Sequence, residues 1–512
     1  MGEVNAIELK GVTKRFGEVV ANDNINMTLR KGEILSILGE NGSGKTTLMN
    51  MLSGIYFPDE GQIFVNGEQV TIRSPKDAFS LGIGMIHQHF KLINILTAAE
   101  NIILGLEGAP ILKMDEVRKQ VNDLTERYGF DLNPDQKIYD MSVSEKQTVE
   151  IMKVLYRGAE ILILDEPTAV LTPQETEKLF AVLRNMRAAG KSIIIITHKL
   201  NEVLEISDRV AVLRKGTYVD TVETKDATVD SLTEMMVGEK VTLDIERTEP
   251  VSPKKRIEVR GVTVKNTEGV TVLKDASFTA NSNEILGIAG IAGSGQKELL
   301  ESIAGLQVME HGEVLYFSPE GVTEKLSEKK PEEIRSLGVT LSFVPEDRLG
   351  MGLVGSMDLT DNMMLRSYKE GKSVFADRKQ PRDLAEEIVE KLEVVTPGVD
   401  TPVSRLSGGN VQKILVGREI ASQPNVLMVA YPVRGLDINS SYTIYNLLNE
   451  QKNKGVAVIC VGEDLDVLLE LCDKIMVLSA GEVVGIEDAR TTTKEKLGLM
   501  MTGGHKGGKK HE

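Results

Sequence analysis

Short apolar runs alternate along this chain with segments of helical periodicity. Residues 33–38 read as a buried strand that ends in a glycine turn, and the next segment predicts a helix over residues 46–52. Residues 161–164 and 193–196 are further runs of buried-strand character, each four apolar residues long. Strands that are apolar on both faces and alternate with helices are typical of a parallel sheet covered by helices. The pattern therefore predicts an α/β fold.

The pattern occurs twice, which indicates a tandem duplication. The glycine-rich segment 39–44 recurs at an offset of 251 residues, and the run 213–216 recurs at an offset of 265. A repeat of this length is a duplicated domain and not a solenoid unit. We expect a first domain, a polar proline-containing linker, a second domain and a polar tail, with bounds at residues 1–242, 243–256, 257–504 and 505–512.

Composition narrows the range of functions. The 512 residues include 60 basic and 76 acidic side chains, and the formal net charge of −16 argues against nucleic acid as the main partner. Two cysteines exclude a disulfide scaffold and fit a reducing compartment. No apolar run approaches the roughly 20 residues of a membrane-spanning helix, and no signal-peptide pattern is present. Work at a membrane would therefore require another chain.

One segment of the first domain has the composition of a phosphate-binding loop. It fits the pattern G-x-x-x-x-G-K-[ST], between a predicted strand and a predicted helix, over Gly39, Glu40, Asn41, Gly42, Ser43, Gly44, Lys45 and Thr46. Glycines let backbone N–H groups wrap a phosphate, and a helix N-terminus adds partial positive charge. We expect Lys45 to reach the β- and γ-phosphates and the Thr46 hydroxyl to ligate Mg²⁺. The adjacent Thr47 is assigned to the same nucleotide site.

Acidic and polar side chains follow the buried strands of the first domain. One predicted strand ends in Asp165 and Glu166, and ligands bind at the carboxyl ends of strands in such folds. Asp165 suits Mg²⁺ through water, and Glu166 is placed to polarise an attacking water. His198 follows the next predicted strand, so we expect it near the same edge. Gln88 follows another short strand, and its residue type alone leaves functional and structural roles equally open.

These elements, in this order, resemble the ATPase subunit of ABC transporters, and the resemblance covers nearly the whole chain. A highly specific ABC signature stands in the second half at Leu406-Ser407-Gly408-Gly409-Asn410. The resemblance implies two P-loop nucleotide-binding domains, each a mostly parallel sheet with a helical signature subdomain. It also implies ATP and Mg²⁺ as ligands, and it assigns nucleotide contacts to Ser407, Gly408, Gly409 and Asn410.

The same resemblance assigns roles in the first domain. Phe16 matches the aromatic residue that stacks on adenine, and Gln88 matches the Q-loop residue at the metal and γ-phosphate. Asp165 and Glu166 match the Walker B end and the catalytic glutamate. His198 matches the switch histidine. With Lys45, these residues are expected to form the catalytic group, and Thr46, Gln88 and Asp165 the metal group.

Two such modules in one chain resemble the ATPase subunits of simple-sugar and nucleoside importers. The motif His87-Gln88-His89-Phe90-Lys91-Leu92 is closer to the nucleoside-type members. The likeness implies two membrane permease subunits, an extracytoplasmic substrate-binding protein and a peripheral place at the cytoplasmic face of the membrane. It also implies that the apolar segment 89–97 contacts a permease loop.

The second half departs from the family pattern at the chemical positions. Lys45 corresponds to Gln296, and Thr46 to Lys297. At the Walker B end, Ala430 and Tyr431 replace the two acids, while Glu463 replaces the switch histidine and Glu346 replaces Gln88. These replacements predict that the second P-loop does not support phosphoryl transfer. Nucleotide binding without hydrolysis stays open there.

The signatures show the reverse pattern. The first half has Met141-Ser142-Val143-Ser144-Glu145 where the second keeps its glycines, and Thr172 where the second has the D-loop residue Asp437. In ABC ATPases a nucleotide lies between one module's P-loop and the other's signature. Every intact motif then belongs to one site and every altered motif to the other. The sequence predicts one hydrolytic site and one degenerate site.

Three alternatives stay open. A ribose- or galactose-type sugar importer keeps the fold and changes the cargo, and only the short motif at residues 87–92 favours nucleosides. A soluble tandem ABC ATPase acting on ribosomes or DNA is disfavoured by the altered site, the short linker and the charge of −16. A non-hydrolysing scaffold is disfavoured because the first P-loop and Walker B motifs are complete.

Overall fold

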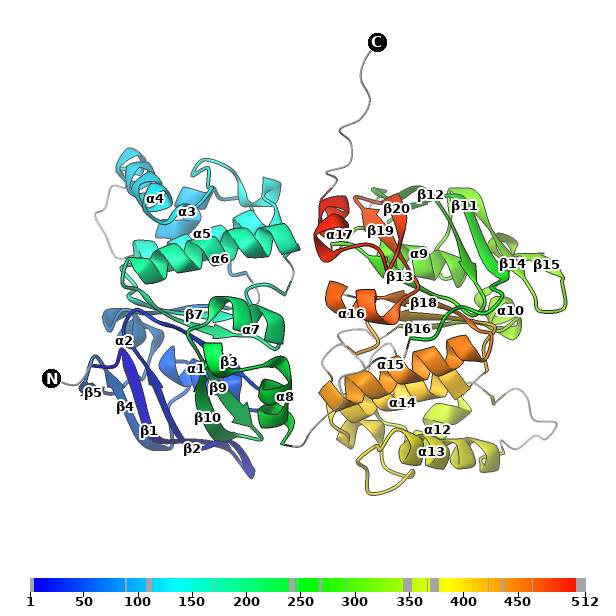
Figure 1. Ribbon diagram of the computed structural model, residues 1–512, viewed down its shortest axis with the longest axis horizontal. Helices are drawn as coiled ribbons and strands as arrows, with labels where there is room; N and C mark the ends of the chain where they lie inside the picture. The colour runs from blue at the N-terminus through cyan, green and yellow to red at the C-terminus, as the bar shows by residue number, and fades with distance from the viewer. Residues whose placement is uncertain are drawn as a thin grey trace, which may run out of the picture. The chain divides into compact units, whose positions relative to one another are not determined.

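The chain forms two compact units, Met1–Thr242 and Leu243–Glu512 (Figure 1). The computed structural model describes residues 4–87, 90–106, 113–169, 171–238, 245, 247–266, 269–291, 293–343, 352–365, 367–368, 377–421, 423–433, 436, 438–462 and 464–502. Within these residues, no helix combines the length and the apolar character needed to cross a membrane.

The first domain is built on parallel strands that are apolar on both faces. They lie in the order β9 (Arg209–Arg214), β3 (Ile34–Leu38), β8 (Ser192–Ile196), β7 (Ile161–Asp165) and β6 (Ile83–Ile86). Every residue of β3 and β8 is buried, which explains why uninterrupted apolar runs marked these strands in the sequence. The predicted strands and the α/β class are confirmed.

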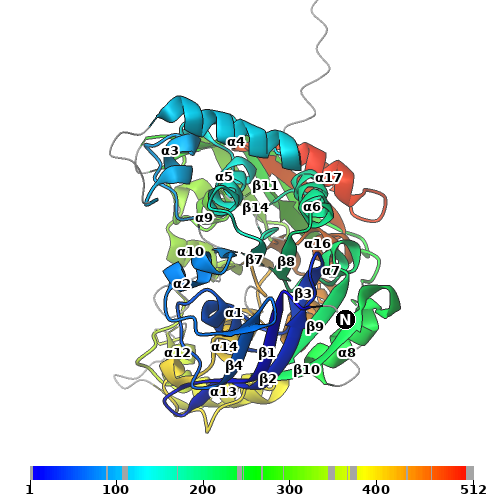
Figure 2. The same ribbon diagram turned by 90° about the vertical axis from the view of Figure 1, so that its left-hand side faces the viewer.

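A mainly antiparallel extension, in which only the short pairing of β10 (Thr217–Glu223) with β2 (Val19–Leu29) is parallel, completes this ten-stranded sheet and was not revealed by the sequence pattern. It consists of β1 (Ile7–Phe16), β2, β4 (Glu60–Val65), β5 (Glu68–Val70) and β10. Figure 2 shows β1, β2 and β4 side by side, next to β9 and β10. Their burial is mixed, so polar and apolar positions interrupt one another and weaken the sequence signal.

Helices cover the first-domain sheet in two groups. The group on the upper side in Figure 1 contains α3 (Ala98–Ile103), α4 (Met114–Tyr128), α5 (Val143–Tyr156) and α6 (Pro173–Ala188). The others are α1 (Lys45–Leu52), α2 (Pro75–Ser80), α7 (Leu200–Ile206) and α8 (Val229–Val237), with 3₁₀ turns at Ile138–Asp140 and Thr224–Asp226. Helix α1 confirms the helix predicted after the glycine-rich loop.

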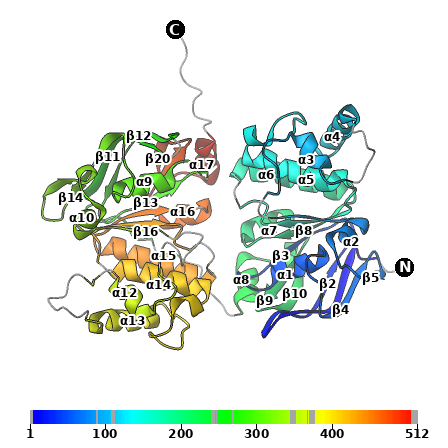
Figure 3. The same ribbon diagram turned by 180° about the vertical axis from the view of Figure 1, so that it is seen from behind.

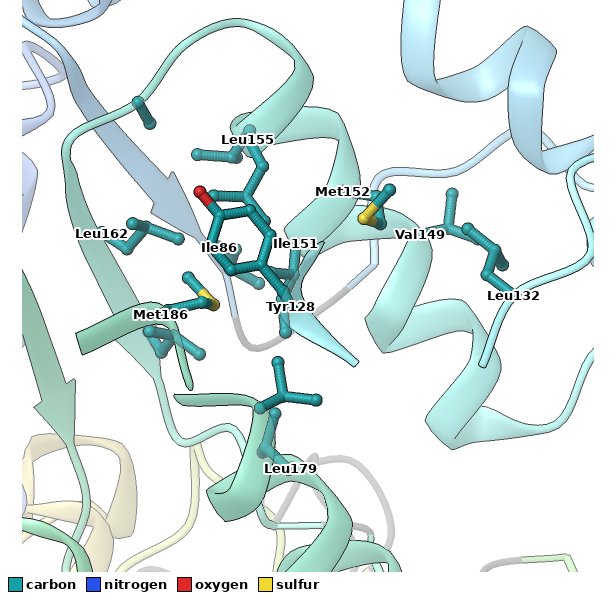
Figure 4. Close-up of a cluster of buried hydrophobic side chains, with 14 of the residues drawn as sticks. Ile86, Tyr128, Leu132, Val149, Ile151, Met152, Leu155, Leu162, Leu179 and Met186 are labelled. Atoms are coloured by element: carbon teal, nitrogen blue, oxygen red, sulfur yellow. The ribbon is translucent and has the colours of Figure 1, made fainter. Parts of the chain in front are cut away.

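A buried cluster joins the first helical group to the sheet (Figure 4). Tyr128 at the end of α4 is almost fully buried, together with Ile151 and Leu155 of α5, Met186 of α6 and Leu162 of β7. Residues from three helices and a strand thus share one core, because each element has a single apolar stripe to cover. The C-terminal half of α5 is thereby packed against the sheet.

The second domain repeats this architecture. Its parallel sheet has the order β16 (Val339–Phe343), β17 (Val426–Ala430), β18 (Ala457–Val461), β13 (Ile285–Ala289), β19 (Lys474–Ser479) and β20 (Glu482–Asp488), with β20 antiparallel to β19. A separate antiparallel sheet contains β12 (Thr271–Asn281), β11 (Lys255–Lys265), β14 (His311–Phe317) and β15 (Thr323–Lys325).

The helices of the second domain follow the same plan. On one side of the parallel sheet lie α12 (Leu359–Met364), α13 (Lys379–Lys391), α14 (Gly408–Ala421) and α15 (Ile438–Asn453), as Figures 1 and 3 show. The others are α9 (Gln296–Ile303), α10 (Pro331–Ser336), α16 (Leu465–Leu471) and α17 (Lys494–Met501), with 3₁₀ turns at Leu326–Glu328 and Val403–Arg405.

Individual hydrogen bonds repeat as well. The N–H of Ile34 donates to Asp208 Oδ2, and that of Ile285 to Asp473 Oδ2, both at 2.9 Å. Both contacts satisfy the first amide of the central strand, which its sheet neighbours leave open. The duplication inferred from the sequence therefore extends to single polar contacts.

The segment just before β11 is fastened to the second domain. Ile245 packs into a core cluster of that domain. Arg247 Nη1 donates to the carbonyls of Leu469 and Cys472 at 2.8 and 2.7 Å. These contacts cap carbonyls at the end of α16, where the helix leaves them without partners. Of the described part of the linker, residues 245 and 247 thus belong physically to the second domain.

A buried ion pair lies under the same segment. Lys452 Nζ donates to Asp473 Oδ1 at 2.9 Å and to the carbonyl of Thr248 at 2.6 Å, and both charged side chains are almost completely buried. In the first domain the corresponding pair, Arg187 and Asp208, is 2.7 Å apart but is 44% and 27% exposed. The linker segment therefore shields the ion pair of the second domain from water, whereas the corresponding pair of the first domain is partly exposed.

We expect the variant Lys452→Met to destabilise the second domain by about 3 kcal/mol, because the buried Asp473 carboxylate would lose its nearer cation and keep Arg490, whose Nη2 lies 3.5 Å away. The matched variant Arg187→Met should cost less than about 1 kcal/mol, because water screens the exposed pair. Chemical denaturation of the full chain measures both. Equal losses in the two variants would contradict this interpretation of the linker.

Candidate functional site

The glycine-rich loop between β3 and α1 is packed too tightly for side chains at two points. A Cβ on Gly39 would lie 2.3 Å from the carbonyl oxygen of Leu213, and one on Gly44 would lie 2.3 Å from that of Ala21. Gly44 also has a φ of 94°, which favours glycine. The Ser43 hydroxyl is buried and has no hydrogen-bond partner within the described residues. The loop backbone is therefore tightly packed, and the Ser43 hydroxyl remains available to form a hydrogen bond with a ligand.

The side chain of Lys45 points back into this loop. Its Nζ donates to the carbonyls of Gly39 and Glu40 at 2.6 and 2.9 Å, and the residue is 7% exposed. Burial lowers the pKa of Lys45, and the negative charges of Glu166, Asp165 and Glu40 oppose that shift. The loop's own carbonyls therefore hold the ammonium.

The end of β7 brings an acid and a histidine together. Glu166 adopts a left-handed backbone with φ of 47°, and its N–H donates to the carbonyl of Ile196 at 2.9 Å. Glu166 Oε1 lies 2.9 Å from His198 Nδ1, which comes from the segment after β8. A non-glycine residue in this conformation is strained, by about 1–2 kcal/mol. The fold therefore holds this carboxylate at the edge of the sheet at a cost in stability.

The two adjacent carboxyl groups are shifted in opposite directions. Burial and the charge of Glu166 raise the pKa of Asp165 to about 6, against the attraction of Lys45. Burial also acts to raise the pKa of Glu166, but the hydrogen bond and charge of His198, with the charges of Lys45 and Lys199, outweigh it, and the net shift is downward. Glu166 is therefore firmly ionised at neutral pH, whereas Asp165 is held close to its titration range.

Oxygen atoms suited to Mg²⁺ are present near the loop. Thr46, the second residue of α1, has an exposed side chain, and Asp165 supplies a carboxylate whose negative charge opposes the lowering of the Lys45 pKa. The described residues contain no cluster of three or more acidic, histidine or cysteine side chains, so the protein alone offers no complete cage. Mg²⁺ commonly takes one or two protein ligands and completes its shell with phosphates and water. The donor set fits such an ion; Gln88, the third predicted metal residue, lies outside the described residues.

The signature segment forms an open helix start in the second domain. Helix α14 begins at Gly408, and Ser407 and Gly408 are exposed, while Gly409 and Asn410 are half-buried. Ser407 Oγ accepts hydrogen bonds from the backbone N–H and from Nδ2 of Asn410, at 3.4 and 3.0 Å. No acidic residue lies in the first turn. Such a helix start attracts an anion.

The corresponding helix start in the first domain is closed by its own carboxylate. At the beginning of α5, the Ser142 N–H donates to Glu145 Oε2 at 2.7 Å, and the Glu145 N–H donates to Ser142 Oγ at 3.3 Å. This capping box places negative charge where a phosphate would have to bind. The sequence showed that the glycines are replaced here, but the capping role of Glu145 was not predicted, although the pattern S-x-x-E indicates it.

The second P-loop keeps the backbone arrangement with different side chains. Gln296 Nε2 donates to the carbonyl of Ile291 at 3.1 Å, in the place where Lys45 contacts Glu40. Tyr431 has a φ of 54°, and its N–H donates to the Val461 carbonyl at 2.9 Å, as Glu166 does in the first domain. The Tyr431 ring packs against the hydrophobic core of the domain. Glu346, Asp437 and Glu463 lie outside the described residues.

A scan against protein families matches the chain twice to the model described as ABC transporter, over residues 22–169 and 273–432. The matched ranges contain the P-loop, β7 and their second-domain counterparts. The chain belongs to the ABC transporter family, whose ATP-binding proteins are ATPases that bind ATP.

Curated relatives match over nearly their whole length. The nucleoside import ATP-binding protein NupA of Lactococcus lactis is 41% identical over 510 residues, which is 99% of each chain. The guanosine import ATP-binding protein NupO of Bacillus subtilis is 41% identical over 97% of each chain. The ribose import ATP-binding protein RbsA 1 of Rubrobacter xylanophilus is 38% identical over 97% of this chain and 98% of the relative.

Solved structures show the fold alone. An archaeal ribosome recycling factor, aABCE1, crystallised with a ribosomal stalk protein, has a TM-score of 0.57 at 16% identity and covers 91% of this chain and 87% of its own. An ATP-binding cassette of an ABC transporter in its ADP conformation covers 46% of this chain and 99% of its own, at 25% identity and a TM-score of 0.42.

The charge arrangement predicts how stability depends on pH in nucleotide-free protein with EDTA. Because folding raises the pKa of Asp165 from 3.8 to about 6, its contribution to stability is complete below about pH 4 and is lost as the pH rises through about 6. The non-titrating variant Asp165→Asn should therefore gain thermal stability over wild type at about pH 7.5 and little at about pH 4.

The control for this prediction is Asp77→Asn. The backbone hydrogen bond from Arg73 lowers the pKa of Asp77, so its contribution is present above about pH 4 and lost below it. This variant should lose stability at the higher pH, the opposite sign. A gain in Asp165→Asn that is equal at both pH values would contradict the burial of the Asp165 charge.

Proposed function

We propose that this protein is the ATP-hydrolysing subunit of an ABC importer that takes up nucleosides. The pairing of Glu166 with His198 beside the buried Lys45 is the observation that carries the catalytic part of the proposal. The names of the two relatives at 41% identity, which import nucleosides and guanosine, support the cargo. The motif at residues 87–92 favours the same assignment.

Each residue of the first P-loop region has a task in this proposal. Lys45 exchanges the carbonyls of Gly39 and Glu40 for the β- and γ-phosphates of ATP. Glu166, ionised and held by His198, orients the attacking water and accepts its proton. Thr46 and Asp165, with Gln88, would hold Mg²⁺, which would supply positive charge to neutralise the phosphates.

One hydrolytic site follows from the distribution of intact motifs. The first domain supplies the P-loop, the acids and His198, and the second domain supplies the open helix start at Ser407, Gly408 and Gly409. The second P-loop, with Gln296 and Tyr431, would be served only by the helix start that Glu145 closes. Scattered decay would damage both sets, so the segregation supports one working site and one degenerate site.

The variant Glu166→Gln should lower ATP turnover by about a hundredfold or more, because the amide cannot accept a proton from water. Gln296→Ala, at the position of Lys45 in the second P-loop, should retain roughly half of the activity or more. Steady-state hydrolysis by the full chain with its membrane partners measures both. Substantial turnover by Glu166→Gln would refute the single-site assignment.

A rigid apolar segment of the first domain supports docking on a permease. The Lys91 N–H donates to Glu150 Oε1 at 2.6 Å, and Ile93 exchanges two hydrogen bonds with the Asn101 side chain. These contacts fix a loop on which Ile95 is 74% exposed. An isoleucine held in water by a rigid loop is typical of a protein contact. We place the chain at the cytoplasmic face of the membrane, bound to two permease subunits that receive cargo from a substrate-binding protein.

Uptake by cells tests the cargo and the docking together. The variant Ile95→Asp should reduce uptake of labelled guanosine at least tenfold while the isolated chain keeps its basal ATP hydrolysis, because a charge would be buried at the contact. Val322→Asp, at an exposed valine of the second domain, is the control and should transport normally. Uptake of ribose in place of guanosine would establish the sugar importer, the alternative that the 38% identical ribose relative supports.

A further inference from the structure

Two aromatic rings meet at the tip of the β1–β2 hairpin in the first domain. Phe16, the last residue of β1, and Tyr56, in the loop after α1, pack edge to face with ring centroids 5.1 Å apart and an angle of 72° between the planes. The residues are 43% and 37% exposed. A pair that packs together and still presents ring surface to solvent can take a flat ligand by stacking.

Charged contacts fasten the Tyr56 loop to β1. Lys14 Nζ donates to the carbonyl of Phe57 at 2.8 Å and to Asp59 Oδ1 at 2.9 Å. The backbone N–H of Arg15 donates to Asp59 Oδ2 at 2.6 Å. These three bonds involve the two residues before Phe16 and two residues within three positions of Tyr56. The loop that carries Tyr56 is therefore held against the end of β1 that carries Phe16.

Besides Tyr56, the Phe16 ring has a contact with Lys14, whose Nζ lies 5.6 Å from the ring centroid, but the hairpin tip itself is exposed. Phe16 pairs with Val19 across a two-residue turn that begins at Gly17, with φ of 60°, and Val19 is itself 65% exposed. A side chain at such a tip loses rotamer freedom when a ligand stacks on it, and that loss weakens binding. A ring already packed against Phe16 removes part of the loss before the ligand arrives.

The second domain lacks this pair. Gln307 stands at the position of Tyr56, and its Nε2 donates to the carbonyl of Lys265 at 3.0 Å. The hairpin segment 265–271 contains no aromatic residue. The domain that lost the phosphate chemistry thus also has a polar side chain where the first domain has a ring. The aromatic pair occurs only with the complete P-loop.

We propose that Tyr56 is a positioning residue for the purine base of the nucleotide, acting by holding the ring of Phe16 in the orientation that stacks on the base. The inference rests on the proposed role of Phe16 in binding adenine. It extends the base site from one aromatic side chain to an anchored pair. Tyr56 acts through its ring and not its hydroxyl, since the observed contact is between rings.

Two ligands separate a base effect from a phosphate effect: ADP, and inorganic pyrophosphate, which has no base. In the full chain, Tyr56→Leu should raise the dissociation constant of ADP roughly three- to tenfold, in line with the strength of an aromatic pair. It should leave that of pyrophosphate unchanged. Tyr56→Phe, which keeps the ring, should bind ADP within about twofold of wild type. Isothermal titration calorimetry measures each constant.

The control variant is Phe57→Leu on the same loop. The Phe57 ring lies 5.8 Å from the guanidinium of Arg73 and is not part of the pair, and its backbone carbonyl stays available to Lys14. This variant should bind ADP like wild type. A loss equal to that of Tyr56→Leu would mean that the loop fold and not the ring pair matters, and would overturn the inference.

A double-mutant cycle with Phe16→Leu completes the test. Tyr56→Leu should have no further effect once Phe16→Leu is present, because Tyr56 acts only through that ring. Full additivity, or an equal loss for pyrophosphate, would overturn the positioning role while leaving the Phe16 assignment intact. Normal ADP binding by Phe16→Leu would overturn both the adenine role of Phe16 and the inference about Tyr56.

Discussion

The buried ammonium of Lys45 is the charge around which the first domain is organised. A cation can be kept out of water only if nearby oxygens and negative charges compensate it. Two loop carbonyls do so directly, and the carboxylates at the end of β7 do so through space. The same cation helps to keep Glu166 ionised beside Asp165, which its own burial drives toward protonation. The charge states of Lys45, Asp165 and Glu166 depend on one another, so all three side chains must lie at the same edge of the parallel sheet.

Comparison with the second domain shows which features of the first-domain site come from the backbone alone and which come from its charged side chains. Tyr431 keeps the left-handed conformation and the hydrogen bond of Glu166, and Gln296 keeps the inward turn of Lys45. The backbone geometry therefore does not depend on the charges. In the second domain a phenol packed on the core and an amide bonded to the loop occupy these two positions without a buried charge.

The N-termini of helices α5 and α14 also differ between the two domains. The N-terminus of α5 is neutralised by the Glu145 carboxylate, whereas that of α14 carries only Ser407 and glycines ahead of Asn410. A helix start stabilises negative charge from any source. An internal carboxylate makes the helix more stable and removes its use for a ligand. Of these two helix starts, the one in the second domain therefore has no internal carboxylate in its first turn.

Sequence alone determined the buried strands, the helix after the P-loop, the duplication and the family, because these depend on local apolar runs and on short motifs whose spacing is fixed. It also predicted Lys45, Glu166 and His198 as site residues, each next to a recognisable strand, and the structure brings Glu166 and His198 to within 2.9 Å. It did not reveal the antiparallel strands, the anchoring of residues 245 and 247, the closure of α5 by Glu145, or the contact of Tyr56 with Phe16. Apart from the capping box, these features join segments far apart in the chain. Packing in three dimensions decides which exposed ring contacts another and which ion pair is covered. Burial then determines how much each contact contributes to the free energy of folding.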